Sequence, residues 1–127
     1  GSTMMLLWVM LAGGIGSGLR FLVGVWAVSA FGVSFPYGTL IVNLVGCFVL
    51  AVVAQLASAG SVSPELRTVI AVGLIGGFTT YSGFNMETIG LLSSGAAGAA
   101  GLNIAITIAG GLAAGWLGLT VARMLHA

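Results

Sequence analysis

The third apolar stretch of the chain, residues 64–92, reads PELRTVIAVGLIGGFTTYSGFNMETIGLL. Its start is typical of a helix, because Pro64 suits a first helical position and Ser63 suits the cap before it. Its middle, residues 73–85, is crowded with glycine, threonine and serine and is poor in helix formers. The sequence therefore predicts a helix that begins near Pro64, breaks near 76–80 and then resumes.

Three further apolar stretches accompany this one, and together the four use nearly all of the 127 residues. A spanning helix needs roughly 20 apolar residues. The composition is 59% hydrophobic and 4% charged, whereas a soluble domain carries about 25% charged residues. We predict an all-α integral membrane protein: a Gly-Ser-Thr cloning remnant at 1–3, then one domain over 4–127 with spans at about 4–30, 39–57, 64–92 and 96–125.

The few charges exclude several classes of function. The net charge is +1, with neither lysine nor aspartate in the chain, so binding of nucleic acid through phosphates is not expected. Glu65 and Glu87, the two carboxylates, lie 22 positions apart without a nearby histidine or cysteine, so no metal cluster forms between them. The single histidine, His126, is at the chain end, and we expect no enzyme.

The distribution of arginines predicts little preference for one orientation in the membrane. Four spans place both termini on one side together with Arg67 and Arg123, while Arg20 lies toward the other side. Insertion in both orientations would allow an antiparallel, dual-topology homodimer. The 22 glycines, many spaced four apart, allow helices to approach backbone to backbone.

Polar residues inside the apolar stretches are the candidates for function. An arginine within a spanning helix costs about 2.5–3.5 kcal/mol on insertion scales. Arg20 either snorkels to the headgroups or lines a vestibule, and Asn43 either joins two helices or offers amide donors to an anion. The complete set is Arg20, Asn43, residues 79–85, Glu87, Asn103 and Thr107.

The predicted break is the most informative of these features. Backbone groups freed at membrane depth are tolerated where they line a cavity or are covered by protein or ions. Carbonyls of residues 76–80 could therefore surround a monovalent cation. Tyr81 and Phe84 are three residues apart and share a helix face, which suits either simple packing or a pore wall with positive ring edges.

Three motifs resemble those of the Fluc (CrcB-type) fluoride channels. They are Gly16-Ser-Gly-Leu-Arg20, Gly38-Thr-Leu-Ile-Val-Asn43-Leu-Val-Gly46 and Gly76-Gly-Phe-Thr-Thr80-Tyr-Ser-Gly-Phe84-Asn-Met-Glu87-Thr88. The match extends over all four spans, and the last two motifs in this order are highly specific.

The resemblance implies an antiparallel homodimer with two fluoride pathways and a central structural sodium ion. Carbonyls of Gly76 and Thr79 would hold the sodium, and Arg20 would belong to a vestibule. The fluoride pathway would comprise Asn43, Thr80, Tyr81, Ser82, Phe84, Glu87 and Thr107. The chain departs from the common pattern at Tyr81, Gly83 and Asn103.

By the same resemblance, the protein would be a multi-pass protein of the bacterial inner membrane, with membrane lipid and a second copy of itself as partners. It would export fluoride passively and so give resistance to fluoride, with selectivity from a narrow path that supplies donors to a small anion.

Two other readings remain open at the level of sequence. Small dual-topology pumps that exchange protons for drugs or cations have a similar size and need a carboxylate in the membrane, for which Glu87 is the candidate. A helical scaffold subunit would account for the glycines, but it would leave the polar break without a purpose.

Overall fold

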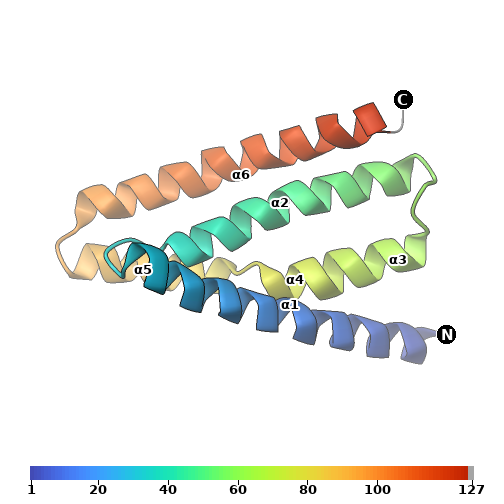
Figure 1. Ribbon diagram of the computed structural model, residues 1–127, viewed down its shortest axis with the longest axis horizontal. Helices are drawn as coiled ribbons and strands as arrows, with labels where there is room; N and C mark the ends of the chain where they lie inside the picture. Colours follow the sequence, from blue (N-terminus) through green and yellow to red (C-terminus); the bar gives the residue numbers. More distant parts are fainter. Residues whose placement is uncertain (126–127) are drawn as a thin grey trace.

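The computed structural model describes residues 1–125 and consists of helices joined by short turns (Figure 1). No strand occurs within these residues, and the all-α prediction is confirmed; His126 lies outside them. The helices are α1 (Ser2–Phe31), α2 (Tyr37–Ser58), α3 (Pro64–Thr68), the π-helix η1 (Val69–Ile75), α4 (Gly76–Phe78), α5 (Tyr81–Ser93) and α6 (Ala97–Leu125).

Four segments are long and apolar enough to cross a membrane, which confirms the predicted number of spans. They are α1, α2, the run Pro64–Ser93 and α6, with mean hydropathies of 1.7, 2.4, 1.2 and 1.8. Large apolar side chains point outward all along them, for example Phe21 at 69% and Leu112 at 73% exposure. Such a surface suits lipid or another apolar partner and would be unfavourable in water.

The third span starts as its sequence predicted. Ser63 Oγ accepts a hydrogen bond from the amide of Leu66 at 3.1 Å, and Pro64 takes the first helical position. The helix then widens into η1 over Val69–Ile75, which the sequence did not predict. π-helical turns are rare and concentrate at functional sites, and this one lies directly before the Gly76-Gly77 pair.

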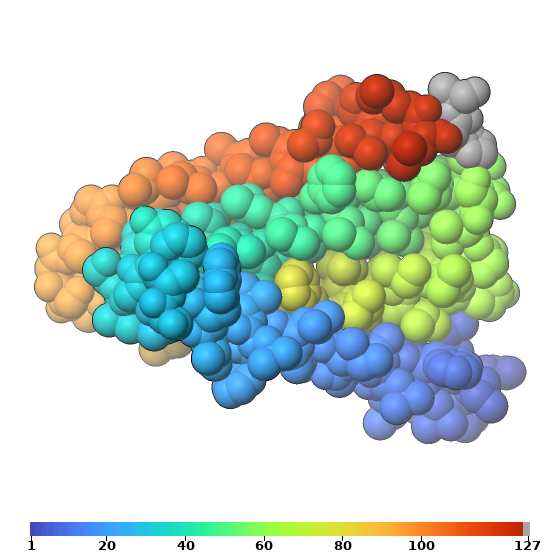
Figure 2. Space-filling model, in the orientation of Figure 1, coloured from blue at the N-terminus to red at the C-terminus, as the bar shows by residue number. Residues whose placement is uncertain are grey.

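The spans pack in an order that places α2 at the centre. α6 packs chiefly against α2, whereas α1 packs against η1, α4 and α2. Figure 2 shows the four spans side by side, in the order α6, α2, the third span and α1. The start of α1, the end of α6 and the turn between α2 and α3 lie at one end of the molecule (Figure 1).

Glycines make the crossing between α1 and the third span possible. A methyl group on Gly16 would collide with the carbonyl oxygen of Leu74 and lie 2.8 Å from the amide nitrogen of Phe78. A methyl group on Gly77 would likewise collide with the carbonyl oxygen of Gly13. The backbone of α1 therefore touches the backbone of η1 and α4, as small-residue interfaces allow.

We predict that Gly16→Ala destabilises the protein by about 1–3 kcal/mol, because the added methyl group meets backbone atoms that have no free space to move into. Gly14→Ala on the same helix is the matched control, since its methyl group meets nothing within 4 Å. The measurement is the free energy of unfolding in mixed detergent micelles. Equal stability of the two variants would contradict the close crossing.

Candidate functional site

The third span loses its helical conformation at two residues. Thr79 (φ −85°, ψ 160°) and Thr80 (φ −150°, ψ 112°) are extended, and α5 begins at Tyr81. Thr80 starts the new helix as its cap, because its Oγ1 accepts a hydrogen bond from the amide of Gly83 at 3.0 Å. The depth of these residues in a membrane stays a prediction.

Asn43 on α2 binds both backbone groups of Thr80, at the point where the helix is interrupted. The amide nitrogen of Thr80 donates to Asn43 Oδ1 at 2.8 Å, and Asn43 Nδ2 donates to the carbonyl oxygen of Thr80 at 3.2 Å. The side chain of Asn43 therefore replaces the helical acceptor of the Thr80 amide, and it adds a second donor to the Thr80 carbonyl oxygen, which also accepts from the amide of Phe84 at 3.5 Å. Only one Nδ2 proton is engaged in this pair, which leaves the second for another acceptor.

A second side chain supports the break from α1. Arg20 Nε donates to the carbonyl oxygen of Gly77 at 3.1 Å, and Ser17 Oγ is 3.5 Å from the same oxygen. Arg20 is part-buried, and this bond directs its guanidinium toward the break rather than wholly toward a membrane surface. The positive charge of Arg20 therefore lies beside the extended residues.

The carbonyls of residues 76–79 lose the amide donors they would have in a continuous helix, and Arg20 binds that of Gly77 instead. The amide of Thr80 would bond to Gly76, but it donates to Asn43, and the amide of Gly83 would bond to Thr79, but it donates to Thr80 Oγ1. The carbonyl oxygens of Gly76 and Thr79 are thus available to a cation. This chemistry fits a hard monovalent ion, and the described residues contain no cluster of histidine, cysteine or carboxylate ligands.

A groove of ≈ 600 Å³ lies between α2, α5 and α6, next to the break. Tyr81 and Phe84 form part of its wall, with ring centroids 6.0 Å apart and ring planes at 47°. The remaining lining residues are Asn43, Gly46, Cys47, Leu50, Ile75, Thr79, Asn85, Thr88, Ile104, Thr107 and Ile108. The wall is mostly apolar, with a few polar groups placed along it.

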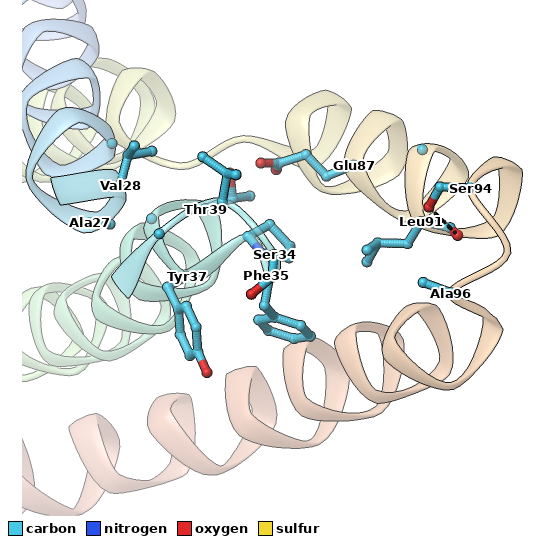
Figure 3. A pocket seen from close by; sticks show the side chains of 16 residues that line it. Ala27, Val28, Ser34, Phe35, Tyr37, Thr39, Glu87, Leu91, Ser94 and Ala96 are labelled. Atoms are coloured by element: carbon cyan, nitrogen blue, oxygen red, sulfur yellow. Dashed lines mark hydrogen bonds between the residues drawn. The ribbon is translucent and has the colours of Figure 1, made fainter. Parts of the chain in front are cut away.

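A second hollow lies on the other side of the break. It has a volume of ≈ 570 Å³, and Arg20, Thr80 and Glu87 contribute to its lining. A third, of ≈ 580 Å³, adjoins it and opens at the loop between α1 and α2. Figure 3 shows the latter, with Glu87 reaching from α5 toward Thr39 on α2. Glu87 lines both hollows, and its buried Oε1 has no hydrogen-bond partner among the described residues.

The residues predicted for one pathway thus fall into two groups. Asn43, Tyr81, Phe84 and Thr107 line the groove, whereas Arg20, Thr80 and Glu87 line the second hollow. Ser82 lines neither, and its Oγ lies 3.3 Å from Thr80 Oγ1. Sequence reasoning did not single out Thr88 in the groove or Thr39 in the hollows. The available signal was that each is a polar residue within a segment long and apolar enough to span a membrane.

The comparison with known families decides the relationship of the chain. The family model described as "CrcB-like protein, Camphor Resistance (CrcB)" matches residues 7–119. The chain belongs to the CrcB family.

Relatives in the CrcB family are named as ion channels and not as enzymes. A protein of Rhizobium etli is 45% identical over 118 residues, which cover 92% of this chain and 94% of that protein. A protein of Sorangium cellulosum is 47% identical over 123 residues, covering 94% and 95% of the two chains. Both are named "Fluoride-specific ion channel FluC".

We predict that Asn43→Ala destabilises the protein by about 1–3 kcal/mol, because the amide of Thr80 loses its acceptor and the carbonyl oxygen of Thr80 keeps only the long bond from the amide of Phe84. Asn85→Ala is the matched control: Asn85 also lines the groove, but it is exposed. Denaturant titration of the purified protein in detergent compares the two. If Asn43→Ala loses no more stability than the control, the extended conformation of Thr79 and Thr80 does not depend on the side-chain amide of Asn43.

Proposed function

We propose that this chain is a fluoride-selective ion channel, which exports fluoride passively from the cytoplasm and thereby gives resistance to fluoride. The observation that carries the proposal is the donor arrangement in the groove. Asn43 is fixed by its two hydrogen bonds to Thr80, and its second Nδ2 proton is available to an anion. The fluoride-specific channels among the relatives support the choice of ion.

The groove has the chemistry that a small dehydrated anion requires. Fluoride must receive hydrogen-bond donors or positive dipole ends in exchange for its water shell. The amide of Asn43 supplies a donor, and the tilted rings of Tyr81 and Phe84 can turn positively polarised edges toward the path. The Tyr81 hydroxyl adds a donor of its own. Chloride is larger and gains less from a narrow path with few donors.

In this proposal, two copies assemble as an antiparallel, dual-topology homodimer that closes the groove. Tyr81 is 78% exposed although it stands beside the break, and Gly76 is also exposed. A partner copy would cover both and turn the open groove into an enclosed pathway. Labelling of engineered termini from each side of sealed cells tests the arrangement, and labelling from one side only would contradict it.

The hollows beside Arg20 and Glu87 would form the aqueous entrance. Arg20 would attract anions, and it lines the same hollow as Thr80, whose neighbour Thr79 lines the groove. The membrane is proposed to be the bacterial inner membrane, whose lipid contacts the exposed apolar side chains.

A structural sodium ion is part of the proposal. The carbonyl oxygens of Gly76 and Thr79 would hold it, and its charge would compensate backbone oxygens that no amide satisfies. The ion would stabilise the extended residues and, with them, the position of Asn43.

We predict that replacing sodium by a large organic cation on both sides of the membrane lowers fluoride flux at least about tenfold, and that adding sodium restores it. The measurement is fluoride efflux from liposomes prepared in the two salts. Potassium serves as the control for ionic strength. Full flux in extensively sodium-depleted protein would contradict a structural role for the ion.

The second candidate is a proton-coupled exporter of drugs or cations, which the unpartnered oxygen of Glu87 favours. Such a pump stops when its carboxylate can no longer exchange a proton, whereas a passive channel needs no such exchange.

We predict that liposomes with the reconstituted protein release fluoride and retain chloride, and that Glu87→Gln still conducts fluoride within about tenfold of the parent rate. Ion-selective electrodes record both anions in parallel samples. No fluoride release from correctly folded protein, together with proton-driven transport of a cationic drug that Glu87→Gln abolishes, would favour the exporter.

A further inference from the structure

A buried amide on α6 holds two of the three threonine hydroxyls that line the groove, those of Thr88 and Thr107. Asn103 on α6 is 2% exposed and does not line the groove itself. Its Nδ2 donates to Thr88 Oγ1 on α5 at 3.0 Å. Thr107 Oγ1 donates to Asn103 Oδ1 at 3.4 Å. One side chain therefore bridges α5 and α6 and contacts both hydroxyls.

The two hydroxyls differ in how firmly their single proton is held. Thr88 Oγ1 donates its proton to the carbonyl oxygen of Phe84 at 2.8 Å, a distance typical of a good hydrogen bond. Thr107 donates to Asn103 over 3.4 Å, which is long for a hydroxyl donor. Thr88 thus has no proton left for an ion in the groove, while Thr107 can turn its proton away from Asn103 at small cost.

We propose that Asn103 sets how tightly the groove binds its anion, because Asn103 Oδ1 competes with the anion for the hydroxyl proton of Thr107. Without an anion, the proton points to Asn103. When an anion arrives, the hydroxyl turns to it and Asn103 Oδ1 loses its donor. This loss weakens anion binding at Thr107. Conduction needs such a limit, since an ion that binds too tightly does not leave.

The inference rests on the proposed channel function and assigns Asn103 as a positioning residue that never touches the ion. Thr88 is held by Asn103 but donates elsewhere, so it serves as an internal comparison. A merely structural bridge between α5 and α6 would depend on the Thr88 side of the amide, because Thr107 lies on α6 together with Asn103.

The test measures fluoride flux against fluoride concentration for Asn103→Leu, which keeps a similar volume and removes the acceptor. The expected result is a half-saturating concentration about two- to tenfold lower, as one lost competing hydrogen bond implies, together with a lower maximal flux. In the Thr107→Val background, Asn103→Leu should leave the half-saturating concentration unchanged. Thr120→Val, which removes an exposed hydroxyl bonded to Trp116 of its own helix, is the control.

A second comparison holds even if Asn103→Leu does not fold. Thr107→Val should raise the half-saturating concentration, whereas Thr88→Val should leave it within about twofold of the parent, because only Thr107 has a proton to offer. Equal responses of the two valine variants would overturn the inference. If the parent protein conducts fluoride, an unchanged half-saturating concentration in Asn103→Leu would also overturn the inference. A parent protein that passes no fluoride would overturn the proposed function and this inference with it.

Discussion

The pair of hydrogen bonds between the amide of Asn43 and the backbone of Thr80 is the interaction on which the rest of the structure depends. A helix in an apolar environment cannot be interrupted unless its freed backbone groups find partners. Asn43 supplies an acceptor and a donor from the central helix, at 2.8 and 3.2 Å. The same bonds fix the orientation of Asn43 beside the groove. Support of the break and presentation of a donor are therefore one feature.

Other contacts around the break follow from this one. Gly16 and Gly77 let α1 approach closely enough for Arg20 to reach the carbonyl oxygen of Gly77. The extended residues turn the carbonyls of Gly76 and Thr79 away from helical partners, and they also set the start of α5. Tyr81 and Phe84 stand on the first turn of that helix, so the direction of α5 determines where their rings lie.

Much of the fold was predictable because a membrane imposes long apolar segments with clear ends. The spans, and the cap at Ser63 and Pro64, follow from composition and capping rules. The π-helix over Val69–Ile75 was not predictable, because no residue type marks a helix that widens under packing with α1. Of the candidate site, the sequence indicated the polar residues but not their partners. That Asn43 binds Thr80, or that Asn103 binds Thr88, depends on how the spans are placed against each other.

The central claim is that the groove beside Asn43 is a path for fluoride and not for larger anions. The most direct measurement is the reversal potential in a planar bilayer, with fluoride on one side, chloride on the other and equal sodium on both. The account predicts a current carried by fluoride alone, so that the reversal potential lies close to the equilibrium potential of fluoride. A reversal potential near zero, which means that chloride passes as readily as fluoride, would contradict it.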